Sequence, residues 1–157
     1  MPSDQAARLS RIERRIRAKR EASRSVQPDL RLAGDRVAFA RERLGFQPDP
    51  WQEQVLCSHG RRSLLNCCRQ SGKSTTTAIL ALHQSLYGSG SLTLLISPSL
   101  RQSSELFKKV TDLLALLPVR PALTEDNRLS LRLKNGSRIV SLPSKEATVK
   151  GFSGARR

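Results

Sequence analysis

The sequence predicts an α/β fold in which a partial parallel sheet is flanked by helices. Apolar segments at residues 63–67 and 92–97 are each followed by a helical pattern, which gives the order strand, helix, strand, helix. Leucines alternate with polar residues over 129–133 and precede Asn-Gly at 135–136. This second pattern predicts a β-hairpin near the C-terminus.

The chain has 157 residues, which is enough for one domain with a core and too few for two sizeable ones. Residues 1–26 carry eight Arg or Lys and three acids, with only Leu9, Ile12 and Ile16 at helical spacing. We expect a basic helical tail over 1–26, and the N-terminal portion of one incomplete domain over 27–157. The tail could dock DNA or a partner helix, or form a solvated, frayed end, because so narrow an apolar stripe buries little area.

The charge of the chain points to a polyanionic partner. Lys and Arg number 28 against 13 Asp and Glu, so the net charge is +15. A small soluble domain usually needs a net charge of magnitude about 2–8. Nucleic acid is therefore the first candidate partner.

The sequence predicts no disulfide bond, zinc site or membrane-spanning segment. Cys57, Cys67 and Cys68 are odd in number and lack C-x-x-C spacing. No apolar run approaches the roughly 18 residues of a membrane span, and the N-terminus lacks a signal-peptide core. We expect a cytosolic protein without a membrane partner.

Two short helices are predicted after the tail. Asp35 can cap a helix over 37–44, and Gly45 follows its last apolar position as a C-terminal stop. The Pro-Asp-Pro sequence at 48–50 predicts an extended turn, from which a second helix begins at Trp51.

The centre of the chain predicts a βαβα unit. Residues 63–67 read as a short buried strand, and 74–87 as a helix closed by Gly88. The continuous apolar run at 92–97 predicts a strand buried on both faces of a parallel sheet. The helical spacing of apolar residues over 106–117 predicts the following helix.

Residues 67–75 (CCRQSGKST) lie between the predicted strand and helix, and they end as a phosphate-binding loop does. Gly72 permits a tight turn that points successive N–H groups at phosphate oxygens. Lys73 can reach the β and γ phosphates, and the Ser74 hydroxyl can coordinate Mg²⁺. Thr75 and the first helical turn add N–H groups and the positive end of the helix dipole.

Two residues of this loop depart from the usual pattern. The motif G-x-x-x-x-G-K-[ST] places glycine where Cys67 stands. Arg69 can stabilise transition-state charge in the manner of an arginine finger, or simply face solvent. The residues alone favour solvent.

Several ordered segments carry a family resemblance. They are residues 37–46 (VAFARERLGF), 48–52 (PDPWQ), 68–74 (CRQSGKS), 97–107 (SPSLRQSSELF), 135–139 (NGSRI) and 151–153 (GFS). Together they resemble the large terminase subunit of tailed phages, over about residues 35–157. The resemblance implies a P-loop NTPase fold and an ATPase that drives double-stranded DNA into a capsid.

The resemblance also assigns roles to residues. Gln52, next to the aromatic Trp51, would read adenine, since an amide can pair with both N6 and N7. Arg69 would sense or stabilise the γ phosphate in cis, and it would be catalytic together with Lys73. The implied cofactors are ATP and Mg²⁺, with Ser74 as the metal ligand. The implied nucleotide-binding residues are Trp51, Gln52, Arg69, Gln70, Ser71, Gly72, Lys73, Ser74 and Thr75.

The resemblance implies partners and a location as well. These are double-stranded DNA, the terminase small subunit and the portal protein, with homo-oligomers only in the assembled motor. The implied location is the cytoplasm of a bacterial host.

The chain departs from the family at its acids. The family has an apolar strand ending in Asp-Glu soon after the segment that resembles 151–153. Here no acid after the loop ends an apolar strand, and Glu125-Asp126 lie in a predicted loop after Pro121. We therefore expect a truncated ATPase that binds ATP and hydrolyses it poorly.

Two other functions stay open. An aromatic-Gln pair before such a loop also occurs in superfamily-two helicases, although those generally place glycine where Gln70 stands. A non-catalytic basic protein could instead bind nucleic acid through residues 8–24 and 128–157. Saturable ATP binding would separate the enzyme readings from the non-catalytic one.

Overall fold

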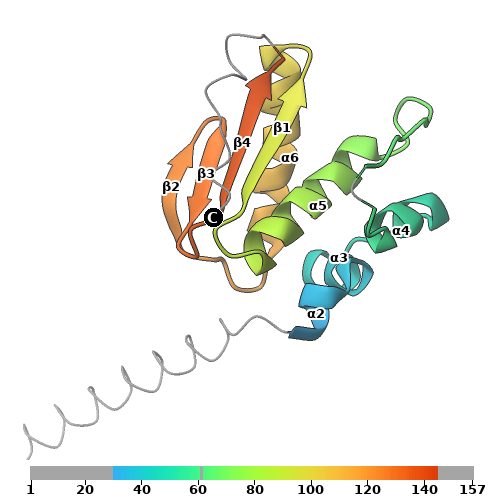
Figure 1. The fold of residues 1–157 in the computed structure, drawn as a ribbon, viewed down its shortest axis with the longest axis horizontal. Coiled ribbons are helices and arrows are strands. Elements are labelled where there is room, and N and C mark those ends of the chain that lie inside the picture. The colour runs from blue at the N-terminus through green and yellow to red at the C-terminus, as the bar shows by residue number, and fades with distance from the viewer. Residues whose placement is uncertain (1–29, 61, 145–157) are drawn as a thin grey trace, which may run out of the picture.

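The computed structural model describes residues 30–60 and 62–144, so the predicted basic tail lies outside the described residues. Figure 1 shows a sheet with helices packed beside it. The elements are α2 (Leu30–Gly34), α3 (Arg36–Leu44), α4 (Pro50–Cys57), α5 (Lys73–Tyr87), β1 (Leu92–Ser97), α6 (Leu100–Leu116), β2 (Leu123–Asn127), β3 (Ser130–Leu133) and β4 (Arg138–Pro143).

The four strands form one mixed sheet in the order β1-β4-β3-β2. β1 runs parallel to β4, with Leu95 opposite Ser141. The pairs β3–β4 and β2–β3 are antiparallel. The predicted α/β class is confirmed, whereas the predicted parallel pairing holds for the β1–β4 pair alone among the described strands.

Helices α5 and α6 pack against each other, and α6 lies on β1 and β4. The Ser141 hydroxyl donates to the Ser103 carbonyl at 2.9 Å, which joins β4 to α6. Ile79 and Leu82 of α5 are fully buried in the same core as Ile139 of β4. Helices α2, α3 and α4 lie beyond α5, so α5 stands between these helices and the sheet (Figure 1).

The ends of the helices follow local signals. The Asp35 side chain accepts from the Ala38 amide at 2.8 Å and so caps α3. Gly45 ends α3 in the left-handed conformation, as predicted. The predicted hairpin between β3 and β4 is also confirmed, and Gly136 turns it with a φ of 85°.

The predicted strand at 63–67 is wrong. These residues form neither helix nor strand, and Leu64 is 95% exposed. A strand needs a neighbouring backbone to bond its N–H and C=O groups. Among the described strands none pairs with the outer edge of β1, so the segment has no partner there.

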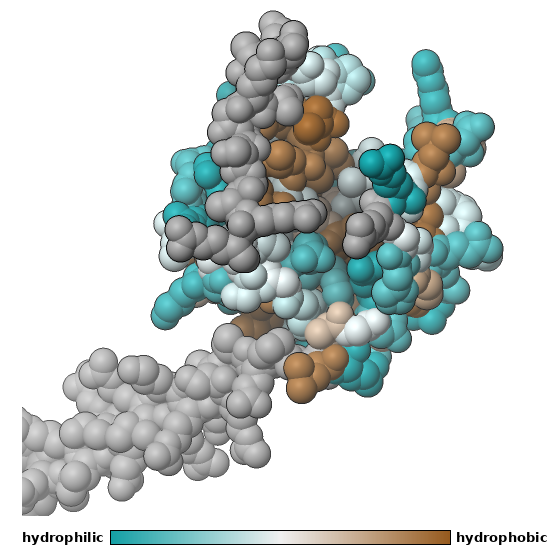
Figure 2. All heavy atoms as spheres, in the orientation of Figure 1, coloured by the Kyte–Doolittle hydropathy of each residue, from teal (hydrophilic) through white to brown (hydrophobic). Residues whose placement is uncertain are grey.

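The prediction that residues 92–97 are buried on both faces of the sheet is also wrong. Ile96 is 48% exposed and Leu92 is 41% exposed, because β1 is an edge strand and its helices cover one face. Figure 2 shows apolar side chains gathered over the β1 and β4 part of the surface. A sheet with one covered face is common among antiparallel sheets, whereas an all-parallel sheet has both faces covered.

Glu125 and Asp126 lie in a strand, not in the predicted loop. β2 pairs with β3, with Asp126 opposite Leu131. Its polar sequence, LTEDN, has no apolar alternation that could have revealed it, and it forms because β3 supplies the hydrogen-bonding edge.

Helices long and apolar enough to cross a membrane are absent from residues 30–60 and 62–144.

Candidate phosphate-binding site

The loop before α5 has an unusual backbone. Gln70 has a φ of 63°, and it is the one non-glycine residue with a positive φ in the described part of the chain. Gly72 has a φ of 89° and is the N-cap of α5. A left-handed residue other than glycine costs about 1–2 kcal/mol, and such strain concentrates at ligand sites.

Helix α5 begins at Lys73, directly after the loop, and no side chain caps its N-terminus. The first amides of any α-helix have no partner within the helix. In α5 these belong to Lys73, Ser74 and Thr75, so their donors and the positive end of the helix dipole face the loop. An uncapped N-terminus of this kind suits an anion such as phosphate.

Lys73 folds back over the start of the loop. Its Nζ donates to the carbonyl oxygens of Cys67 and Cys68 at 2.8 and 2.5 Å. The Ser71 hydroxyl lies at 3.5 Å from the same nitrogen. Within residues 30–60 and 62–144, no carboxylate forms a salt bridge with Lys73. Its charge is thus held by neutral oxygens, at a position where a phosphate could replace them.

The first turn of α5 is held by its own side chains. The Thr76 hydroxyl donates to the Gly72 carbonyl at 3.2 Å, and the Thr77 hydroxyl donates to the Lys73 carbonyl at 2.9 Å. Ser74 is exposed on this turn, and Thr75 is half-buried. The Ser74 hydroxyl is therefore accessible to a metal ion, as its predicted role requires.

Gln52 is buried against the loop. Its side chain is 3% exposed, and its Nε2 donates to the Ser71 carbonyl at 3.4 Å. Its Oε1 accepts from the Asp49 amide at 2.8 Å, which completes the capping box of α4. The structure brings Gln52 to the loop before α5, with both ends of its amide already bonded.

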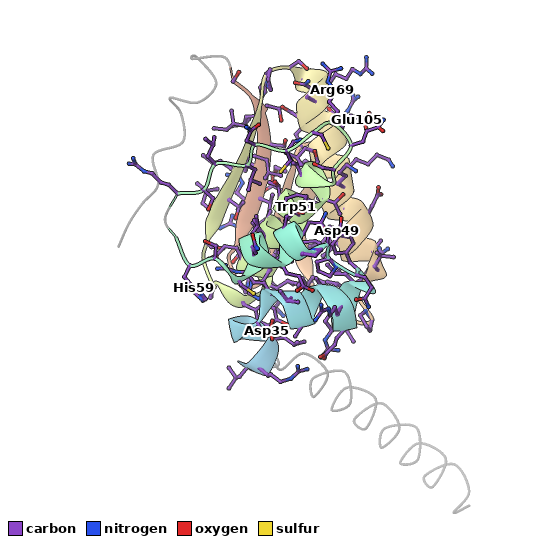
Figure 3. The ribbon with its side chains drawn as sticks, turned by 90° about the vertical axis from the view of Figure 1, so that its right-hand side faces the viewer. Asp35, Asp49, Trp51, His59, Arg69 and Glu105 are labelled. Carbon is purple, nitrogen blue, oxygen red and sulfur yellow. The ribbon has the colours of Figure 1, made fainter. Side chains whose placement is uncertain are left out.

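Trp51 lies on α4 and is half-exposed, whereas Arg69 is exposed on the loop (Figure 3). In the described residues no carboxylate forms a salt bridge with Arg69. The side chain faces solvent, as the residues alone predict. The same exposure leaves it accessible to a ligand bound at the loop.

The site thus unites the end of the loop with α4. The motif in the sequence indicated Gly72, Lys73 and Ser74, whereas no motif indicated the contact between Ser71 and Gln52. The only local signal was the Asp49-x-x-Gln52 spacing of a capping box.

Acidic clusters do not accompany the loop in the part of the chain described here. No group of three or more His, Cys, Asp or Glu residues there could hold a metal ion. Glu105 and Asp112 lie on the helix α6, and Glu125 and Asp126 on the polar strand β2. None of these acids ends an apolar strand.

No protein-family model matches the chain, and no curated protein matches it. The loop and its neighbours therefore carry the functional proposal.

Proposed function

We propose that this chain binds Mg²⁺-ATP through residues 69–75 and forms the ATP-binding part of a DNA-packaging motor of the large terminase type. The observation that carries the proposal is the uncapped N-terminus of α5, preceded by Gly72 at a φ of 89° and opened by Lys73. The proposed role in a DNA-packaging motor rests on the motif resemblance. The proposed binding of ATP is supported by the geometry of the loop.

The residues present fit a triphosphate. The first amides of α5 and the Lys73 ammonium offer donors to its oxygens, and the exposed Ser74 hydroxyl offers a ligand to Mg²⁺. Bound Mg²⁺ would neutralise charge on the phosphates. On binding, the Lys73 ammonium would exchange the Cys67 and Cys68 carbonyls for phosphate oxygens.

Hydrolysis by this chain should stay near background. Phosphoryl transfer to water needs a group that orients or activates the water, usually an acid close to the γ phosphate. The described acids after the loop lie on α6 and on the polar strand β2, not at the end of an apolar strand. Robust turnover would mean that one of them, or an acid outside the described residues, has that role.

The test is a titration of the wild-type chain with ATP, with and without Mg²⁺. Lys73→Ala should weaken Mg²⁺-ATP binding by about 10- to 100-fold, because a hydrogen bond to a charged group contributes about 1.5–3 kcal/mol. Lys108→Ala is the matched control, since Lys108 is exposed on α6 and pairs with Asp112. Equal binding by wild type and Lys73→Ala would discard the site.

A second function rests on the net charge of +15. A non-catalytic basic protein would bind duplex DNA with a steep salt dependence, because binding releases condensed counterions. That binding would survive Lys73→Ala, and the chain would show no saturable ATP binding.

A further inference from the structure

We infer that Gln52 is a positioning residue, which holds the phosphate loop in shape rather than reading the adenine base. This inference rests on the proposed function. It implies that Gln52 does not make the site selective for adenine over other bases. It concerns the one buried polar side chain that α4 directs at the loop, within the described residues.

The hydrogen bonds of Gln52 are the first reason. To recognise adenine, one amide must offer its oxygen to the N6 donor and its nitrogen to the N7 acceptor. Here the oxygen accepts from Asp49 and the nitrogen donates to Ser71. With the side chain 3% exposed, a base would have to displace both partners and open the contact with the loop.

The bond to Ser71 controls the direction of the next amide. In a planar trans peptide, the C=O and N–H of one unit point in opposite directions. Because Gln52 Nε2 holds the Ser71 carbonyl, the Gly72 N–H of the same peptide unit points away from Gln52. Gln52 therefore helps to fix the orientation of a loop amide directly before Lys73.

Close packing against Gly72 supports the same role. A Cβ built on Gly72 would lie 2.5 Å from Gln52 Nε2, closer than any ordinary contact. The space left by the missing side chain is therefore filled by the glutamine amide. Gly72 serves two needs at once, the left-handed φ and the approach of Gln52.

The other end of the side chain is anchored to a helix. The capping box ties Gln52 Oε1 to the Asp49 amide at the start of α4, and α4 packs against α5. The glutamine thus links a packed helix to the loop. Its loss should loosen the loop, whatever base the ligand carries.

The experiment measures binding of Mg²⁺ complexes of ATP, GTP and inorganic tripolyphosphate to two variants. Gln52→Glu keeps an oxygen for Asp49 but loses the donor to Ser71. Gln52→Met keeps the shape and loses both bonds. Gln54→Glu is the matched control, because Gln54 is exposed on the same helix.

In each Gln52 variant the affinities for all three ligands should fall by a common factor, about two- to tenfold, because both variants lose the hydrogen bond to Ser71. Gln54→Glu should bind like the wild type. A loss confined to ATP would overturn the inference in favour of base reading. Unchanged affinity for all three ligands in both variants would overturn it as well.

Repeating the binding measurements at low pH distinguishes a positioning role of Gln52 from a general loss of stability in its variants. A protonated carboxyl carries a donor that can serve Ser71. The deficit of Gln52→Glu relative to Gln54→Glu should therefore shrink as the pH approaches the titration range of the carboxyl. The deficit of Gln52→Met should stay constant. Equal pH responses of the two Gln52 variants would contradict the role of the donated bond.

Failure of the proposed function would look different. In that case the wild type would bind none of the three ligands, or Lys73→Ala would bind them as well as the wild type does. An intact Lys73 dependence with unchanged Gln52 variants would reject the positioning role alone.

Discussion

His83 Nε2 lies 2.8 Å from the carbonyl oxygen of Leu32 and joins the middle of the chain to α2. The imidazole is buried on α5 between aromatic rings, with its centroid 5.3 Å from Phe39 and 4.7 Å from Tyr87. Leu32 is itself fully buried. This contact attaches the first described helix to the core around α5.

The His83 contact predicts a loss of stability in acid. Burial lowers the pKa of His83, an effect that the Leu32 carbonyl partly opposes; Arg36 lowers the pKa further and Asp35 raises it. The folded state therefore binds fewer protons than the unfolded state just below the ordinary value of 6.5. Stability is fully present above that pH and is lost as the pH falls through the window beneath it.

His83→Gln should reduce this pH dependence, because an amide can still donate to Leu32 but does not titrate. The measurement is the free energy of unfolding in urea at several pH values from neutral to mildly acidic. His59→Gln is the control, since His59 is exposed. If His83→Gln and wild type lose stability in parallel, the buried histidine is not the cause.

A pair of leucine substitutions tests the corrected fold before the loop. Leu82→Ala should lower the free energy of unfolding by about 2–5 kcal/mol, because Leu82 is fully buried in α5. Leu64→Ala should change it by less than about 0.5 kcal/mol, because Leu64 is 95% exposed. Comparable losses in the two variants would indicate that residues 63–67 form a buried strand after all.

Asn135 should contribute to the free energy of unfolding by joining the β3–β4 turn to the end of α5. Its Nδ2 donates to the Ser85 carbonyl at 2.8 Å, and its Oδ1 accepts from the Ser137 amide at 2.9 Å. Asn135→Ala removes these part-buried hydrogen bonds and should cost about 0.5–1.5 kcal/mol. Asn127→Ala, an exposed asparagine on β2, is the control in the same thermal or urea unfolding experiment. Equal effects would remove the special role of Asn135.

Arg69 should distinguish ATP from ADP if it senses the γ phosphate. Arg69→Ala is expected to weaken ATP about three- to tenfold and to leave ADP nearly unchanged, since only ATP carries the γ phosphate charge. Arg62, an exposed arginine ahead of the loop, provides the control variant Arg62→Ala. Equal weakening of ATP and ADP by Arg69→Ala would show a general electrostatic effect.

Local signals in the sequence predicted the parts of the fold that depend on neighbouring residues. Asp35 and Gly45 bound α3 because a cap and a left-handed glycine act within one turn. Gly136 turns the hairpin for the same reason. The start of α5 after Gly72 was also predicted, to within one residue.

The features that the sequence predicted wrongly or not at all depend on residues far apart in the chain. Residues 63–67 are apolar enough for a strand, yet among the described strands none offers them an edge. Residues 123–127 are too polar to suggest a strand, but β3 pairs with them. The bond between Gln52 and Ser71 joins residues 19 positions apart. Composition and spacing carry no information on such a contact, so the site could be located from its motif but not assembled.

The backbone amides of Gly72, Lys73, Ser74 and Thr75 provide the most direct test of the central claim, that this loop wraps a triphosphate. Their ¹H–¹⁵N resonances should be followed while Mg²⁺-ATP is added to the isotope-labelled chain. We predict saturable downfield proton shifts centred on these four amides, and a titration of Lys73→Ala that needs about 10- to 100-fold more nucleotide to reach the same shifts. Saturable binding that leaves all four resonances in place, with shifts elsewhere, would contradict the account.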